Sequence, residues 1–356
     1  MPKASIQIVT WNSLKFLPDC LESVFKQTYK DFSVLIIDNA SNDGTIEYLE
    51  KNYPQVKMIK NSRNLGFAKA HNQGILTTQS EYILVMNPDI VLEKDFLTKL
   101  IKEAEKDRRI GSLGGKLLKI KLGDIEIGEK IKTNIIDSTG LKIFKSRRMI
   151  DRGEGEVDKG QYDKQKEVFG ISGACVLYRR TALEDIKIPT NYGNFMKIQK
   201  DNSQFVDSQT ICRLASSWEY FDQDFFSYKE DIDLAWRLQL RGWKAIYVPG
   251  ARAYHFRSVS ISNRFSKSQW VNFFSYRNHL WLLLKNDYLR NFLSHIWFIF
   301  WYQLAKEFYL LFTQPKVLLK GSFAFWQGFS KIYRKRKYIL KNAKIKAREI
   351  KQWCER

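Results

Sequence analysis

The apolar positions of the first ninety residues follow two alternating periods. Runs of consecutive apolar residues predict buried strands at residues 5–10, 32–38, 56–61 and 81–87. Apolar residues spaced three and four apart predict helices between them, at residues 14–28, 46–52 and 67–78. Apolar strands that alternate with helices are typical of a parallel sheet covered on both faces. The N-terminal part is therefore predicted to have an α/β fold.

The pattern is less regular from about residue 111 onward. Short strands and turns are expected at residues 120–144, and a buried strand entering a helix at residues 169–180. Residues 187–218 show no clear period, and we interpret them as an inserted surface segment. A helix over residues 231–241 and a strand ending at Pro249 complete the domain.

The sequence beyond His255 is rich in aromatic residues, and helices are predicted there over residues 273–284 and 291–312. Residues 291–305 contain no Lys, Arg, Asp or Glu. This stretch is shorter than the roughly 20 apolar residues that span a bilayer, so an amphipathic helix lying in the membrane interface is expected. The predicted organisation is an α/β domain at 1–260, a helical extension at 261–290, and aromatic helices with a basic tail at 291–356.

Charge points to a polyanionic partner. The chain carries 59 Lys and Arg against 38 Asp and Glu, a net charge of +21. Ten basic residues and one acid lie within residues 331–351, so +9 of that charge belongs to the tail. A polybasic segment beside an apolar helix favours an anionic membrane surface. Nucleic acid is not predicted as a partner, because it calls for basic residues spread over a groove.

The cysteines and the N-terminal residues indicate the cellular compartment of the protein. The four cysteines form no CxxC pair and have no metal-ligand spacing, which is typical of free thiols in a reducing compartment. The first residues enter a strand pattern at once and show no secretory signal. The protein is therefore expected in the cytoplasm.

Several polar residues stand where the predicted strands end, at Thr10, Asp38, Asn39 and Asp89. Parallel sheets bind ligands beyond the carboxyl ends of their strands. Asp89 follows a rigid proline in the stretch EYILVMNPDI, and its carboxylate is suited to Mg²⁺ or Mn²⁺. The alternative for Asp89 is a β-turn with proline at its second position. Asp38 and Asn39 are suited to a pyrimidine nucleoside, or else form a helix N-cap cluster.

Two further segments carry candidate chemistry. Residues 64–74 combine a glycine-permitted backbone approach with a helix N-terminus, which suits a diphosphate. Glu230 and Asp231 begin a helix, where the dipole favours acids without any function, but one of them is placed to act as a general base. His255 is either structural or a metal ligand together with Asp89.

In this order the segments resemble the inverting nucleotide-sugar glycosyltransferases of family 2, which have the GT-A fold, and more narrowly their rhamnosyltransferase-like bacterial branch. The matching segments are VTWNS, LIIDNASNDGT, NSRNLGFAKAHNQG, LVMNPDIVL, ISGACVLYRR, DQDFFSYKEDIDLAWRLQLRGWKAIYVPGARAYH and FSYRNHLWLLLKN. They cover most of residues 5–286. The family's metal motif has two acids flanking one residue, whereas only Asp89 keeps the carboxylate in Asn87-Pro88-Asp89.

The resemblance implies roles for these residues. Asp231 is implied as the base, with Glu230 orienting it or the acceptor, and Asp89 and His255 as ligands of Mn²⁺ or Mg²⁺. The residues implied to bind the donor nucleotide are Thr10, Asn12, Asp38, Asn39, Asn64, Gly66, Asn72 and Asn87.

The resemblance also implies a reaction. The sugar is expected to be L-rhamnose from dTDP-L-rhamnose, moved to a hydroxyl of a glycan or polyprenyl-diphosphate-linked acceptor in bacterial cell-surface polysaccharide synthesis. The alternatives are a UDP-sugar donor carrying galactofuranose, a hexose or an N-acetylhexosamine, and a non-catalytic membrane-associated scaffold. We expect a peripheral protein on the inner face of the cell membrane, although the aromatic helices could instead form a core or the interface of a homo-oligomer.

Overall fold

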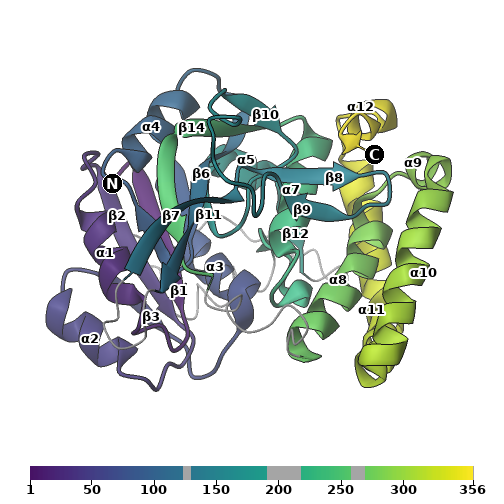
Figure 1. Cartoon of the computed structure of the whole chain (residues 1–356), viewed down its shortest axis with the longest axis horizontal. Coiled ribbons are helices and arrows are strands. Elements are labelled where there is room, and N and C mark those ends of the chain that lie inside the picture. The colour runs from purple at the N-terminus through teal and green to yellow at the C-terminus, as the bar shows by residue number, and fades with distance from the viewer. Residues whose placement is uncertain (123–129, 191–217, 258–268, 356) are drawn as a thin grey trace, which may run out of the picture.

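The structure is a computed structural model that describes residues 1–122, 130–190, 218–257 and 269–355. Figure 1 shows a central sheet flanked by helices, with the C-terminal helices gathered at the end of the molecule opposite the N-terminus. The described strands are β1 (Ala4–Thr10), β2 (Phe32–Asp38), β3 (Lys57–Lys60), β4 (Tyr82–Met86), β5 (Ile90–Leu92), β6 (Ile110–Leu122), β7 (Lys130–Ser138), β8 (Leu141–Phe144), β9 (Met149–Asp151), β10 (Lys166–Val168), β11 (Cys175–Arg179), β12 (Ile188–Pro189), β13 (Trp218–Glu219), β14 (Lys244–His255) and β15 (Cys354–Glu355). The described helices are α1 (Leu17–Phe25), α2 (Thr45–Asn52), α3 (Gly66–Thr77), α4 (Phe96–Ala104), α5 (Arg180–Ile186), η1 (Gln223–Phe225), α7 (Glu230–Arg241), α8 (Gln269–Asn286), α9 (Leu289–Ser294), α10 (Ile296–Thr313), α11 (Pro315–Lys341) and α12 (Ala347–Lys351).

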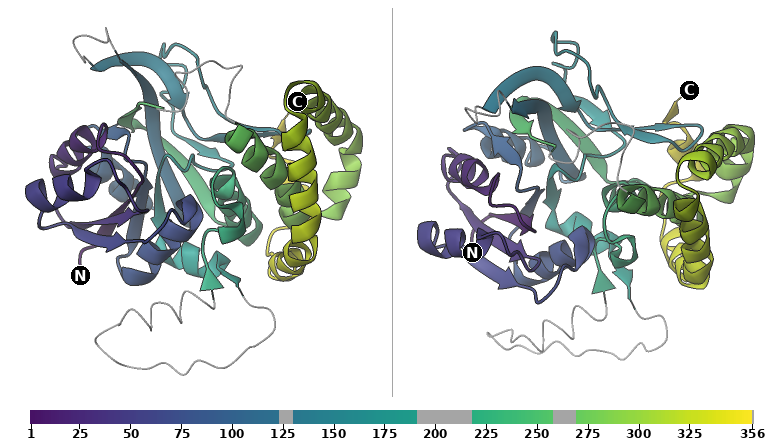
Figure 2. Two further views of the ribbon diagram at one scale, coloured as in Figure 1. Left: turned by 90° about the horizontal axis from the view of Figure 1, so that it is seen from below. Right: turned by 60° about the horizontal axis from the view of Figure 1, so that its bottom comes forward.

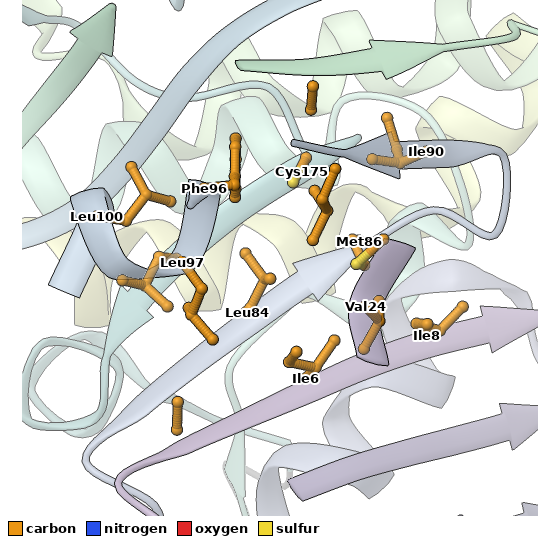
Figure 3. Packing of buried hydrophobic residues seen from close by; sticks show 14 of the residues in the cluster. Ile6, Ile8, Val24, Leu84, Met86, Ile90, Phe96, Leu97, Leu100 and Cys175 are labelled. Atoms are coloured by element: carbon orange, nitrogen blue, oxygen red, sulfur yellow. The ribbon is translucent and has the colours of Figure 1, made fainter. Parts of the chain in front are cut away.

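The N-terminal strands form the predicted parallel sheet in the order β3-β2-β1-β4. Their apolar runs are buried because helices cover both faces, and Figure 3 shows Ile6, Leu84 and Met86 packing against Val24 of α1 and Leu97 of α4. Helix α1 begins later than predicted and has a proline in its first turn, where the missing N–H costs no helical hydrogen bond. The parallel register places Thr10 opposite Asp38, at the carboxyl ends of β1 and β2.

The rest of the large sheet is mixed, which the apolar pattern does not predict. Strand β11 lies antiparallel between β4 and β6, and β6 pairs in parallel with β14. The prediction that this last strand ends at Pro249 is wrong, since β14 continues to His255. The register shifts between Val248 and Arg252, so the proline lies in an irregularity where the ladder tolerates its missing N–H. The continued strand places His255 opposite Ile90 of β5.

The C-terminal helices pack against the α/β part and share a core with it. One apolar cluster joins Trp236 of α7 to Trp281 of α8, Ile332 of α11 and Ile350 of α12. Figure 2 shows the same grouping of these helices in two further views, and β15 adds a parallel strand beside β8. The predicted helix at 291–312 is divided at His295 into α9 and α10. The division of the chain at 260 and 290 stays a prediction.

The predictions of an insertion, of free cysteines and of helices too short to span a membrane can be compared with the described residues. Of the predicted insertion at 187–218, residues 191–217 lie outside the described residues, as does Cys212. The cysteines in the described ranges, Cys20, Cys175 and Cys354, are free thiols as predicted. Within the same ranges, none of the helices has the length and apolarity that crossing a membrane requires.

Candidate active site

Hydrogen bonds between side chains join the ends of β1 and β2. The Thr10 hydroxyl donates to Asp38 Oδ1 over 2.8 Å, and both residues are fully buried. The backbone N–H of Ser41 donates to Asp38 Oδ2 over 2.9 Å, and its hydroxyl donates to Oδ1 over 2.6 Å. Asp38 therefore fixes the turn after β2 as well as the strand end.

Asn39 connects this edge to the start of α3. Its backbone N–H donates to the Thr10 carbonyl over 2.9 Å, and its side-chain amide donates to the Gly66 carbonyl over 3.4 Å. Asn64 in turn accepts the Gly66 N–H over 2.8 Å. Gly66 has a φ of +79°, and a Cβ there would lie 2.6 Å from the carbonyl oxygen of Phe226, so only glycine fits. The start of α3 thus touches the chain that leads into α7.

Asn12 and Asn72, which are also predicted to bind the donor, are engaged with backbone groups. Asn12 has a φ of +51°, and its side-chain oxygen accepts the N–H of Asn42 over 2.9 Å. The buried Asn72 accepts the N–H of Phe221 over 2.9 Å and donates to the carbonyl of the same residue over 2.7 Å. Asn12 lies at the exposed rim, whereas Asn72 holds the segment before η1 against α3.

Asp89 and His255 meet where β5 and β14 pair. Asp89 Oδ1 lies 3.2 Å from His255 Nε2, and His255 Nδ1 lies 2.8 Å from Asp137 Oδ2. Arg257 pairs with the other oxygen of Asp137 over 2.6 Å. Burial alone lowers the pKa of His255, but the carboxylates of Asp89 and Asp137 outweigh it and raise that pKa to about 10. The imidazole is therefore held between two acids in a fixed orientation.

The contacts of His255 with Asp89 and Asp137 can be compared with those of known metal ligands. A metal-ligating histidine commonly donates its other ring N–H to a carboxylate, as His255 Nδ1 does to Asp137. Mg²⁺ and Mn²⁺ are usually held by one or two protein side chains together with phosphate oxygens of the substrate. Among the described residues, no group of three or more His, Cys, Asp or Glu side chains is arranged to hold a metal ion. Asp89 and His255 are the residues that could hold a cation whose remaining ligands come from a bound diphosphate, and His255 would have to release its Nε2 proton to do so.

The acidic pair begins α7. The half-buried Asp231 accepts the backbone N–H of Gly173 over 2.9 Å at Oδ2 and that of Ile232 over 2.8 Å at Oδ1. Burial raises its pKa, although these two N–H groups oppose the shift. Glu230 is more deeply buried, and burial together with the adjacent Asp231 charge raises its pKa to about 8. Asp231 is thus the more accessible acid of the two, and both of its oxygens accept backbone N–H groups.

A chain of contacts brings Asp231 and Asp89 to the same edge of the sheet. The Asn87 N–H donates to the Ala174 carbonyl over 2.9 Å, two residues before Asp89. The residue before Ala174 is Gly173, which contacts Asp231. Since β4 and β11 are neighbours, the turn after β4 and the start of α7 face each other across the start of β11.

Sequence reasoning missed four residues of this arrangement, namely Gly173, Asp137, Arg257 and Asn278, the last of which is described below. A Cβ at Gly173 would lie 2.9 Å from the Asp231 Cβ, so the glycine permits the close approach. This glycine stands in the ISGAC segment, where its lack of a side chain could have indicated a close contact with another part of the chain. Asp137 offered none, because its partner His255 is 118 residues away.

Comparisons with known proteins identify relatives of this chain and of its fold. A family model described as "Glycosyl transferase family 2" matches residues 5–187. The "N-acetylglucosaminyl-diphospho-decaprenol L-rhamnosyltransferase" of Mycobacterium tuberculosis is 25% identical over 266 residues, which is 71% of this chain and 75% of that protein. The crystal structure of GalNAc-T7 with UDP, GalNAc and Mn²⁺ superposes with a TM-score of 0.53 at 15% identity, over 79% of this chain and 47% of that one. This last likeness shows the fold, the GT-A arrangement predicted from the sequence.

Proposed function

Because this chain belongs to glycosyl transferase family 2, we propose that it transfers L-rhamnose from dTDP-L-rhamnose, with inversion, to a hydroxyl of a lipid-linked glycan. The mycobacterial relative is named as an L-rhamnosyltransferase and for a decaprenol-diphosphate-linked acceptor, which supports this sugar and this acceptor class. The proposed setting is bacterial cell-surface polysaccharide synthesis. A UDP-sugar donor is the alternative, supported by the UDP in the structure of similar fold.

The observation that carries the proposal is the position of Asp231. Its half-buried carboxylate has both oxygens fixed by backbone N–H groups, and it lies across the start of β11 from the Asp89 turn. In the proposed reaction, Asp231 takes the proton of the acceptor hydroxyl as the oxygen attacks the anomeric carbon. The bond from that carbon to the diphosphate oxygen breaks on the opposite face, and its electron pair leaves with the nucleoside diphosphate.

The donor would bind along the edge formed by Thr10, Asp38 and Asn39, with its diphosphate toward the start of α3 and the Asp89 turn. Asp89 and His255 would hold Mn²⁺ or Mg²⁺. When bound, the cation supplies positive charge that stabilises the departing diphosphate. Glu230 would orient Asp231 or the acceptor.

We expect the purified protein to turn over dTDP-L-rhamnose in a panel of nucleotide sugars with Mn²⁺ or Mg²⁺. EDTA should abolish turnover and added Mn²⁺ should restore it, because the leaving group then lacks its counter-charge. Asp89→Ala should lower kcat by about 100-fold. Initial rates of dTDP release give the measurement.

The matched control is Asp95→Ala, which removes an aspartate paired with Lys99 over 2.7 Å on α4 and should leave kcat within about twofold. Turnover of a UDP-sugar in place of dTDP-L-rhamnose would assign the alternative donor. Full activity of Asp89→Ala in EDTA would contradict the metal assignment. A wild-type protein that turns over no donor would favour a non-catalytic scaffold.

An exposed aromatic surface supports a place on the membrane. Helix α10 carries Trp297, Trp301 and Phe312, which are 70%, 62% and 78% exposed. Their spacing of four and eleven residues places them along one side of the helix. Helix α11, which packs beside α10, also carries exposed aromatic residues, Phe323 and Trp326. We propose that this surface enters the interface of the anionic cytoplasmic leaflet, which would bring the enzyme to a lipid-linked acceptor.

The structure changes the expected role of the basic tail. Lys335 is fully buried among carboxylates, and Lys331 pairs with Asp224 over 2.6 Å. The predicted basic surface therefore loses the Lys335 charge, and the exposed Lys331 charge is paired with an acid. Arg334, Lys337 and Lys341 remain exposed, and α11 adds Lys316 and Lys320 near its start.

We expect the full-length protein to float with vesicles containing anionic lipid, more strongly than with purely zwitterionic ones. The double variant Trp297→Ser/Trp301→Ser should lower the bound fraction by about tenfold, because it removes the largest exposed apolar groups. The control Ile131→Ser removes an exposed apolar residue from β7 and should bind as wild type. A wild-type protein that ignores vesicles and forms dimers through this surface, measured by analytical ultracentrifugation, would contradict the membrane proposal.

A further inference from the structure

The loop that leads into α7 has a strained backbone. Phe226, Tyr228 and Lys229 have φ angles of +64°, +69° and +69°. Bulky side chains rarely adopt this conformation, which persists only where the surroundings impose it. The two residues that follow are Glu230 and Asp231. The direction in which Asp231 is presented therefore depends on what holds residues 225–229.

One side chain of α8 holds most of this loop. The amide nitrogen of Asn278 lies 2.9 Å from the carbonyl oxygen of Phe225, 3.0 Å from that of Ser227 and 2.7 Å from that of Tyr228. Asn278 is fully buried. In a regular helix or strand each of these three carbonyl oxygens would accept a backbone N–H. Here they share the side-chain amide of Asn278 as their donor.

Arg277 orients this amide and extends the contact. Its guanidinium donates to Asn278 Oδ1 over 2.8 Å, which leaves the amide N–H groups facing the loop. It also donates to the carbonyl oxygens of Asp224 over 2.8 Å and Phe225 over 3.2 Å. Trp281 holds the guanidinium in place, with the ring centroid 4.1 Å away. Burial lowers the Arg277 pKa only to about 10, so the group stays charged at neutral pH.

The opposite side of the loop rests on α3. The Ala68 N–H donates to the Phe226 carbonyl over 3.3 Å, at the place where Gly66 permits the close approach. The loop therefore packs against the start of α3, where we place the diphosphate, through a backbone contact that involves neither Arg277 nor Asn278. The loop is clamped between the donor side and α8.

We propose that Arg277 and Asn278 are positioning residues of the transfer reaction, which hold residues 225–229 in the one conformation that presents Asp231 to the acceptor. This inference rests on the proposed function. It assigns a role to the FSYRNHLWLLLKN segment, which is distant in sequence from the acids. It also makes α8 part of the catalytic apparatus.

The test compares Asn278→Asp and Arg277→Lys with the wild type. A carboxylate at 278 cannot donate to the three carbonyl oxygens, and a lysine at 277 loses the planar fork. We expect kcat to fall by about 100-fold with the donor KM within about twofold, because the base is displaced while the nucleotide edge is intact. We also expect the acidic limb of the pH profile of kcat to move to lower pH, since a displaced loop admits water to the buried acids.

The matched control is Asn291→Asp. Asn291 is also a buried asparagine of the C-terminal helices, and it donates to the Ala347 carbonyl over 2.8 Å, away from the loop. It should leave both kcat and the pH profile near those of the wild type. If Asn278→Asp does not fold, Arg277→Lys alone decides, because its partly exposed side chain tolerates the change better.

Two outcomes would overturn the inference. One is a kcat for Arg277→Lys within about twofold of that of Asn291→Asp. The other is a fall in kcat with an unmoved pH profile, which indicates general destabilisation. If the wild type turns over no donor, the proposed function fails, and hydrogen exchange decides the inference separately. Amides of residues 227–231 should then exchange at least about tenfold faster in Arg277→Lys than in Asn291→Asp, and equal rates would refute the clamp.

Discussion

Asp231→Asn is expected to lower kcat for sugar transfer by about 10²–10⁴-fold, the range attributed to a positioned general base. Asp231 accepts hydrogen bonds from the backbone N–H groups of Gly173 and Ile232. Asparagine has the same shape, and its side-chain oxygen can still accept one of these two bonds. The fold and the donor edge should therefore survive, with the donor KM close to the wild-type value. Steady-state rates of dTDP release with a saturating acceptor measure the effect.

Glu230→Gln separates the two acids. No described group donates a hydrogen bond to Glu230 Oε2, and the raised pKa of about 8 keeps much of this carboxyl protonated at neutral pH. We therefore expect only about a tenfold fall in kcat, from a changed orientation of Asp231. If Glu230→Gln removed activity while Asp231→Asn retained it, the two assignments would have to be exchanged.

The pH profile gives a second readout of the same assignment. The base acts in its ionised form, so activity should fall as the pH drops through the Asp231 pKa, which burial raises above the ordinary 3.8. Stability has the opposite sign, because a raised carboxyl pKa favours the folded state when the group is protonated. The contribution of Glu230 is fully present below its ordinary pKa of 4.5 and is lost as the pH rises to about 8. The acidic pair thus weakens the fold in the same pH range in which it becomes able to accept protons.

Local pattern is enough to predict the edge on which we propose that the donor binds, because that edge is built from strands close together in the sequence. Strands β1, β2 and β4 are largely apolar, and the polar residues Thr10, Asp38 and Asp89 stand at or just beyond their carboxyl ends. Parallel packing then places those ends at one edge.

The other half of the site depends on contacts between distant segments. The antiparallel insertion of β11 puts Gly173 beside Asp231, and the continuation of β14 past Pro249 puts His255 beside Asp89. Hydrophobic residues that recur every two or every 3.6 residues predict strands and helices, but they do not predict which distant segments contact each other. The same limit explains Lys335, which looks like one more cation of a basic tail but meets an acid 116 residues away.

Lys335→Met is expected to lower the free energy of unfolding by about 3–5 kcal/mol, the usual cost of removing one partner of a buried ion pair. The Lys335 ammonium of α11 lies 2.6 Å from Glu219 Oε1 and 2.8 Å from Asp224 Oδ2, and also bonds the buried Asp222. Lys285 of α8 binds the second oxygen of Asp222. Methionine fills a similar volume but leaves Glu219 without its cation, so the loss is electrostatic. Urea unfolding followed by tryptophan fluorescence measures it.

The pH dependence of this loss identifies its cause. Burial alone raises the pKa of Asp222, but Lys285 and Lys335 outweigh it and hold that pKa well below the ordinary 3.8. Asp222 therefore stays ionised from pH 8 to pH 4, whereas burial raises the pKa of Glu219 and the Lys335 charge opposes that rise. Without Lys335 the buried Glu219 carboxyl takes up a proton as the pH falls, so the deficit of Lys335→Met should shrink between pH 8 and pH 4. Lys337→Met, which changes an exposed lysine of α11, should stay within about 0.5 kcal/mol of the wild type at both pH values. Equal, pH-independent effects of the two variants would mean that packing of α11 alone, and not its buried charge, holds the segment before α7.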